Sequence, residues 1–178
     1  MDKVIAFPAQ SEYPTYANMY MKYTVKDGSL ITQLKQSLET TLALIKSLSE
    51  DKLNFRYQAG KWSIKDILVH IIDDERIYGY RALAFARNDK TNFPGFEQDD
   101  YANFADTDQR SIENILAEYQ AIRLATTTLF EGFSETALQR IGTANNNNTS
   151  VRALGYHILG HELHHIEIIK KHYLKQTF

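Results

Sequence analysis

The sequence contains no cysteine, and this absence excludes several kinds of chemistry at once. Thiol nucleophiles, disulfide bridges and cysteine-ligated zinc sites are all ruled out, so any metal ion must be held by His, Asp or Glu. Glycine and proline are also scarce, with 8 and 3 among 178 residues, which leaves long stretches for helices. The six histidines are therefore the candidate metal ligands.

The chain also lacks an excess of positive charge and a long apolar run. Its 20 Lys and Arg against 22 Asp and Glu give a net charge of −2, which argues against nucleic-acid binding. No apolar run approaches the roughly 20 residues of a membrane span, and the start Met1-Asp2-Lys3-Val4 does not resemble a signal peptide. With 43% hydrophobic residues the chain can bury a core, so we expect one cytoplasmic domain over 1–178.

Apolar residues recur at spacings of three and four along most of the chain, which is the pattern of amphipathic helices. No strand pattern competes with them, so the sequence predicts an all-α four-helix bundle. The expected helices cover residues 29–48, 63–87, 107–130 and 149–173.

Helix start signals support these boundaries. Ser63 followed by Asp66 is a variant capping box for the second helix, and Asp106 with Gln109 marks the expected start of the third. Thr149-Ser150 caps the fourth helix, after a run of four asparagines, 145–148, that predicts a turn.

Two segments outside these helices are rich in aromatic residues. Residues 88–105 form a long connector between the second and third helices, and we expect this ordered loop to pack on the bundle and to line a pocket. Residues 1–28 predict a short helical or irregular arm whose tyrosines cover part of the bundle. The aromatic residues concerned are Tyr13, Tyr16, Tyr20, Tyr23, Phe93, Phe96, Tyr101 and Phe104.

Two histidines, His161 and His165, lie in the middle of the apolar stripe of the last helix. Their i, i+4 spacing puts both rings on one face with Cβ atoms roughly 6 Å apart, so both can reach one zinc-like ion at about 2.0 to 2.1 Å. The segment 161–165 is His-Glu-Leu-His-His, and its two outer histidines have the spacing of the two histidines of the His-Glu-x-x-His motif. A hydrogen-bonded pair of core histidines remains the alternative interpretation.

A third ligand has to come from another helix, and His70 is the only candidate histidine outside the last one. It flanks the core-facing stripe of the second helix, where it is either a ligand or a boundary residue that contacts solvent. Three neutral imidazoles on a divalent ion leave one or more positions for water, as in catalytic sites. Such an ion lowers the pKa of bound water and can activate a thiol.

Other polar residues lie close to these candidates along the helices. His157 and His164 fall at the edge of the apolar stripe, where they are exposed to solvent, support a ligand or are ligands themselves, and His172 lies near the helix end. Asp73 and Asp74 share the face of His70, so either could orient an imidazole or accept a proton from metal-bound water, or both are solvated charges.

Glu75 is unusual because it lies among apolar residues of the second helix. A carboxylate in this position needs a partner, and Arg123 or Arg152 could provide it. We interpret Glu75 as a structural ion pair or as a catalytic residue, so Asp74 and Glu75 are the candidate catalytic residues.

Several motifs resemble one known family. The string GKWSIKDILVHIIDDER at 60–76 is similar to the second-helix signature of the DinB superfamily, whose DinB/YfiT-like members are four-helix-bundle metalloproteins. Residues 81–87, the Phe-Pro-Gly-Phe loop at 93–96, and 152–165 continue the match. The resemblance covers nearly the whole chain.

The resemblance implies three histidine ligands, which correspond to His70, His161 and His165. It further implies a divalent ion, commonly zinc or nickel, and often a homodimer. It gives no substrate, because members range from hydrolases to thiol-cofactor transferases and isomerases. We do not interpret the family's name, which comes from a DNA-damage-inducible gene, as evidence of DNA binding.

Two functional hypotheses follow. In the first, the protein is a metal-dependent enzyme for a small-molecule substrate, and its ion activates water for hydrolysis or a low-molecular-weight thiol for transfer. In the second, it is a non-catalytic, stress-related metal-binding or dimerisation module whose arm serves dimerisation. A fourth protein ligand, such as His164 or Asp74, would favour the second hypothesis because it would occupy the position needed by water.

Overall fold

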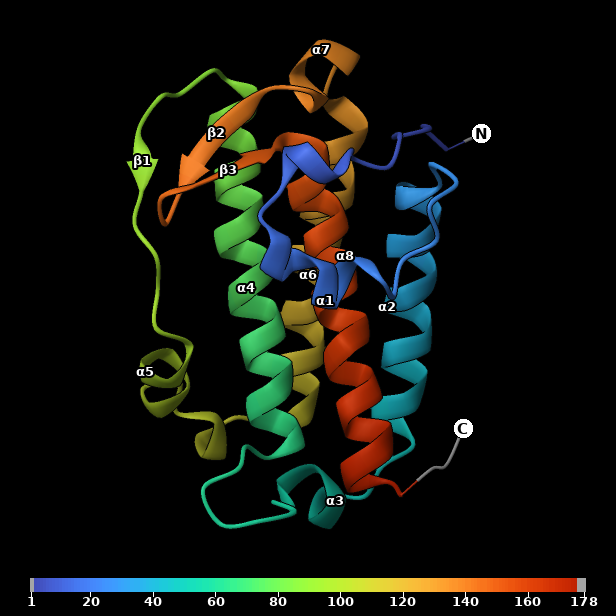
Figure 1. Cartoon of the computed structure of the whole chain (residues 1–178). Coiled ribbons are helices and arrows are strands. Elements are labelled where there is room, and N and C mark those ends of the chain that lie inside the picture. The colour runs from blue at the N-terminus through green and yellow to red at the C-terminus, as the bar shows by residue number, and fades with distance from the viewer. Residues whose placement is uncertain (1, 176–178) are drawn as a thin grey trace.

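Four long helices pack side by side in the computed structural model, which describes residues 2–175 (Figure 1). This arrangement confirms the predicted all-α four-helix bundle with a long connector between its second and third members. The long helices are α2 (Leu30–Lys46), α4 (Ile64–Ala86), α6 (Ile112–Gly132) and α8 (Val151–Ile168), and α8 continues as a π-helical segment, η4 (Ile169–Tyr173). None of the described helices has the length and hydropathy needed to cross a membrane.

Shorter helices fill the connections. The arm contains two 3₁₀ turns and one short helix, and each of the other connections contains at least one helical turn. These elements are η1 (Gln10–Glu12), η2 (Thr15–Ala17), α1 (Asn18–Met21), α3 (Glu50–Asn54), α5 (Gln98–Asn103), η3 (Thr107–Gln109) and α7 (Glu135–Leu138).

Two of the predicted helix starts are confirmed and one is wrong. Ser63 and Asp66 form a reciprocal capping box on α4, and Ser150 caps α8 by accepting a hydrogen bond from the backbone N–H of residue 153. The third helix does not begin at residue 107, because Asp106 is left-handed, with φ of 50°, and the chain forms only the turn η3 before extending again. Ser111 is the N-cap of α6 instead.

A small three-stranded sheet contradicts the expectation that no strand forms. Strand β1 (Asn92–Phe93) runs parallel to β2 (Ile141–Ala144), which pairs antiparallel with β3 (Asn147–Ser150). Asn145 and Asn146 form the two-residue hairpin turn with φ of 49° and 59°, values that asparagine tolerates better than most residues. Only half of the asparagine run is therefore turn, and the other half is strand.

The connector packs on the bundle less completely than expected. Phe93 and Phe96 are half-buried, whereas Tyr101 is 48% and Phe104 is 85% exposed. Residues 98–103 of the connector form α5, which contacts α4. The connector is thus ordered next to α4, but two of its four aromatic rings face solvent.

A polar layer separates two apolar clusters along the bundle. Along each long helix, the residues of one apolar cluster lie before a buried polar residue. The residues of the other cluster lie after it. The residues of this layer are Ser37 and Thr41 on α2, Glu75 on α4, Arg123 and Tyr119 on α6, and Glu162 on α8. Every long helix therefore contributes to one hydrogen-bonded network in the core.

Arg123 lies at the centre of this layer. Its Nε is 2.9 Å from Glu75 Oε1, and its Nη2 is 2.8 Å from a carboxylate oxygen of Glu75 and 2.8 Å from one of Glu162. The hydroxyls of Ser37 and Thr41 donate hydrogen bonds to Glu162. Of the two partners expected for Glu75, Arg123 is the correct one.

The other expected partner, Arg152, binds the N-terminal arm instead. Its guanidinium forms an ion pair with Glu12, and this contact lowers the pKa of Glu12 to about 2. Helix α1 then lies across α8 (Figure 1), at a point where Gly160 has no side chain to obstruct it. A Cβ atom at Gly160 would lie 2.5 Å from the carbonyl oxygen of Tyr20, so the arm requires glycine there.

Replacing the central arginine tests the polar layer. We expect Arg123→Met to lower the free energy of unfolding by about 3 to 5 kcal/mol, because it leaves two buried carboxylates without their cation. The exposed pair of Arg76 with Glu118 provides the control, and Arg76→Met is expected to cost about 1 kcal/mol or less. Urea denaturation measures both losses, and equal losses would contradict a central role for Arg123.

The arm contact gives a pH-dependent prediction. The pKa of Glu12 is lowered from 4.5 to about 2 in the folded protein, so its ion pair stabilises the fold above pH 4.5 and loses this effect as the pH falls toward 2. Glu12→Gln should therefore destabilise the protein at pH 7 and have a smaller effect at pH 3.5. Urea denaturation at pH 7 and pH 3.5 measures the loss of unfolding free energy, and Glu113→Gln, at an exposed position, is the control. The same loss for Glu12→Gln at both pH values would contradict the prediction.

Candidate functional site

Three histidine rings from two helices meet at one point of the bundle. The Nε2 atom of His161 on α8 lies 3.1 Å from Nε2 of His70 on α4 and 3.2 Å from Nε2 of His165, one turn further along α8. Their candidate ligand atoms all lie within 4.8 Å of one another. Four tetrahedral ligands at 2.0 to 2.1 Å from zinc would be about 3.3 Å apart, so the two Nε2 distances from His161 fit a shared ion.

The packing of α4 on α8 creates this meeting. The two helices contact each other more extensively than any other pair, and His70 is 5% and His161 is 4% exposed. His70 is therefore not the solvent-facing boundary residue that was one alternative. The ring of Trp62 lies 4.8 Å from that of His70 and is tilted against it.

The surroundings keep these imidazoles neutral. Burial lowers the pKa of His70, lowers that of His165 to about 3, and lowers that of His161 well below its ordinary value. A neutral imidazole has a free lone pair on one ring nitrogen, which is the form that binds metal ions. In the chemistry of its donors, the histidine triad (His70, His161 and His165) fits a divalent ion.

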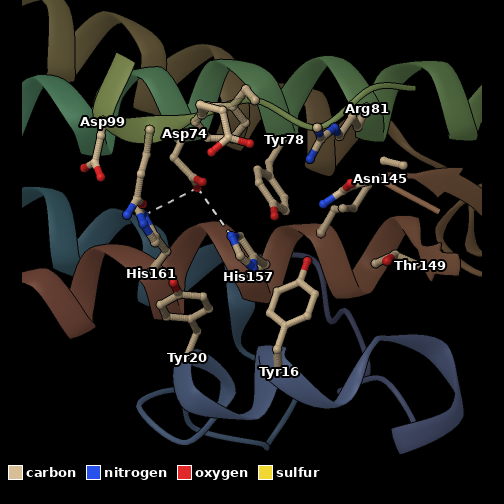
Figure 2. A pocket seen from close by; sticks show the side chains of 16 residues that line it. Tyr16, Tyr20, Asp74, Tyr78, Arg81, Asp99, Asn145, Thr149, His157 and His161 are labelled. Atoms are coloured by element: carbon tan, nitrogen blue, oxygen red, sulfur yellow. Dashed lines mark ion pairs between the residues drawn. The ribbon is translucent and has the colours of Figure 1, made fainter. Parts of the chain in front are cut away.

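Asp74 contacts the triad through the Nδ1 atom of His161. Its Oδ2 atom lies 3.4 Å from Nδ1 of His161 and 3.4 Å from Nε2 of His157 (Figure 2). Although burial alone would raise it, contact with these two histidines lowers the pKa of Asp74 to about 2. Because the carboxylate faces Nδ1, His161 presents its Nε2 to the other two rings.

The structure excludes the solvent-exposed alternative for two residues. Asp74 is 4% exposed and His157 is also 4% exposed, so neither is a solvated residue at a helix edge. The ring of Tyr78 stacks on that of His157 at a centroid distance of 3.7 Å, and Tyr20 of the arm covers the rings of His157 and His161 edge-on. The sequence did not reveal Tyr20 and Tyr78, because tyrosines at helical spacing resemble ordinary core residues.

The remaining candidates are not members of the triad, although the ring of His164 lies 5.3 Å from that of His165. Glu75 is engaged by Arg123 and does not line the cavity beside His161. His164 is half-buried next to Tyr23, and the ring of His172 stacks on Tyr57. Among residues 2–175, the group of converging metal-binding side chains consists of His70, His161 and His165, without a fourth protein ligand.

Two cavities reach the triad. One of about 350 Å³ reaches Asp74, His157 and His161, and another of about 310 Å³ reaches His165 and Trp62. Gln98 and Asp99 of α5 line both cavities, so the connector contributes to the pocket as predicted. Asp99 is an exposed carboxylate near the triad, and it was not among the predicted site residues.

Comparison with known proteins agrees with this geometry. The family model of the DinB superfamily matches residues 33–169. Two curated relatives are both named "putative metal-dependent hydrolase". The one from Oceanobacillus iheyensis is 29% identical over 152 residues, which are 84% of this chain and 87% of that protein. The one from Geobacillus thermodenitrificans is 24% identical over 111 residues, and the match spans only 62% of each protein.

A solved structure shares the fold. YfiT from Bacillus subtilis, described as a probable metal-dependent hydrolase with an unusual four-helix bundle topology, superposes with a TM-score of 0.60. The match covers 94% of this chain and 93% of that one, at 14% sequence identity. At this identity the similarity concerns the fold, and it confirms the predicted YfiT-like bundle.

The contact of Asp74 with His161 can be tested in the metal-free protein. An ionised carboxylate facing Nδ1 favours the tautomer with the proton on that nitrogen. We therefore expect Asp74→Asn to lower the fraction of this tautomer at His161, as measured by ¹⁵N NMR of the ring. The neighbouring Asp73→Asn is the control, since no contact of Asp73 with a histidine is found among the described residues. An unchanged tautomer in Asp74→Asn would contradict the assignment.

Proposed function

Because the chain belongs to the DinB superfamily, we propose that it is a metal-dependent enzyme in which His70, His161 and His165 hold one divalent ion, zinc or nickel. The observation that carries this proposal is the convergence of three neutral imidazoles, two of them buried and one half-buried, on one point beside two cavities. A structural site would have four protein ligands, whereas three leave room for a reacting molecule. The open cavities favour an enzyme over the alternative of a non-catalytic module.

The residues around the triad have separable roles in this proposal. A bound divalent ion would supply Lewis acidity and a lowered pKa for a coordinated water or thiol. Asp74 orients His161, and Tyr20 and Tyr78 exclude water from the buried side of the cavity. Asp99 lies at the rim of both cavities and is the carboxylate that would accept a proton from a reacting group.

Hydrolysis of a small-molecule substrate is the reaction we favour. Both curated relatives and the solved neighbour carry names of metal-dependent hydrolases, and such a reaction needs one organic substrate and water. Transfer of a low-molecular-weight thiol is the second candidate. It is favoured by the two cavities that reach different histidines of the triad, because a transferase must seat a thiol and an electrophile together.

Removal of one triad residue tests metal binding. We expect wild-type protein to bind about one equivalent of zinc or nickel per chain and His161→Ala to lose this binding, because two imidazoles alone do not hold the ion firmly. His172→Ala is the matched control, since His172 lies outside the triad and should leave the stoichiometry unchanged. Elemental analysis after dialysis measures the metal, and circular dichroism verifies the fold.

The same proteins then test the reaction. Metal-loaded wild type is incubated with an activated ester and an aryl halide, with and without a panel of small thiols. Ester cleavage without thiol supports the hydrolase, thiol consumption with the halide supports the transferase, and His161→Ala should lack both. Full metal binding by His161→Ala, or no reaction of either kind in the loaded wild type, would contradict the proposal.

A further inference from the structure

Arg81 is a buried cation without an acidic partner. It lies on α4, is 6% exposed, and lines the larger cavity together with His157 and His161. No carboxylate of the described residues forms an ion pair with it. This distinguishes it from Arg123, the other strongly buried arginine, which contacts two carboxylates.

The contacts that Arg81 does form use only part of its guanidinium. One Nη2 donates a hydrogen bond of 2.8 Å to the carbonyl oxygen of Pro94, and the guanidinium carbon lies 5.0 Å from the ring centroid of Tyr78. A guanidinium has five N–H donors, so most of them remain available. Removing such a charge from water is costly unless an anion compensates for it.

The cavity separates its charges along its length. Figure 2 shows Arg81 and Asn145 at one end and Asp99 and His161 at the other, with Tyr78 between them. Arg81 follows Asp74 by seven residues on the same helix, a separation of about 10 Å along the helix axis. The carboxylate of Asp74 contacts His157 and His161. Its negative charge therefore lies away from a ligand bound at the Arg81 end.

The other acidic residues of the cavity also leave the Arg81 end free. Glu97 and Asp99 are exposed, so solvent screens them. At the Arg81 end of the cavity, Figure 2 also shows the amide of Asn145 and the hydroxyl of Thr149, which come from the β2–β3 hairpin. Arg81 is the one Lys or Arg among the residues that line this cavity. The combination of one cation with two neutral polar side chains matches a singly charged ligand group.

We propose that the Arg81 end of this cavity binds a carboxylate of the substrate, while the reacting part of the same molecule lies at the histidine triad. This inference rests on the proposed function and narrows it to small molecules with a carboxylate several bonds from the reacting group. A carboxylate fits better than a phosphate, since one guanidinium can engage it through two parallel hydrogen bonds. Phosphate sites usually gather additional cations or helix N-terminal amides.

Metal-free wild-type protein provides the test, because its neutral triad does not attract the probe. NMR titration compares hexanoate with hexanamide, which has nearly the same shape without the charge. We expect hexanoate to bind about tenfold or more tightly than hexanamide. Arg81→Met should remove this preference. Arg87→Met is the control, because Arg87 is exposed at the end of the same helix, and this variant should keep the preference for hexanoate.

The outcomes separate the alternatives. Equal binding of the two probes to wild type, or no binding of hexanoate, overturns the inference and assigns Arg81 to holding the Pro94 loop. Inorganic phosphate that binds with the same Arg81 dependence overturns the choice of carboxylate. If Arg81→Met does not fold, the titration is repeated with Arg81→Lys, and the side-chain Nε–H signal of Arg81 is followed in wild type. A signal that does not shift when hexanoate is added counts against the proposal. Metal stoichiometry is measured separately, so either proposal can fail alone.

Discussion

The register between α4 and α8 is the constraint on which the rest of the structure depends. Arg123 of α6 contacts Glu75 on α4 and Glu162 on α8, and these two glutamates lie close in sequence to His70 and His161. A shift of either helix by one turn, about 5.4 Å, would break this ion-pair network and also separate the histidine nitrogens that now lie 3.1 Å apart. The buried charges therefore position the candidate metal site, although they do not line it.

Sequence patterns were sufficient for the features that depend on local geometry. The i, i+4 spacing of His161 and His165 placed both rings on one face of a helix, and the capping residue Ser63 located the start of α4. The choice of His70 as the third histidine relied on elimination and on the resemblance to the family. The structure brings all three together, and their assignment as ligands stays a proposal.

Features that depend on tertiary contacts could not be predicted. Asp74 looked like a solvated charge, because the helix that buries it, α8, is almost 80 residues away in sequence. The strands β2 and β3 were missed since each is only four residues long and neither has an alternating apolar pattern. That no described carboxylate forms an ion pair with Arg81 is a property of the folded surroundings alone. Homodimer formation and cytoplasmic location stay predictions.

The most direct measurement of the central claim is X-ray absorption spectroscopy of the protein loaded with zinc or nickel. The account predicts a spectrum dominated by imidazole ligands, with three histidine nitrogens at about 2.0 to 2.1 Å from zinc and the remaining position filled by oxygen from solvent. A coordination shell with fewer than three imidazoles, or one completed by a protein carboxylate, would contradict it.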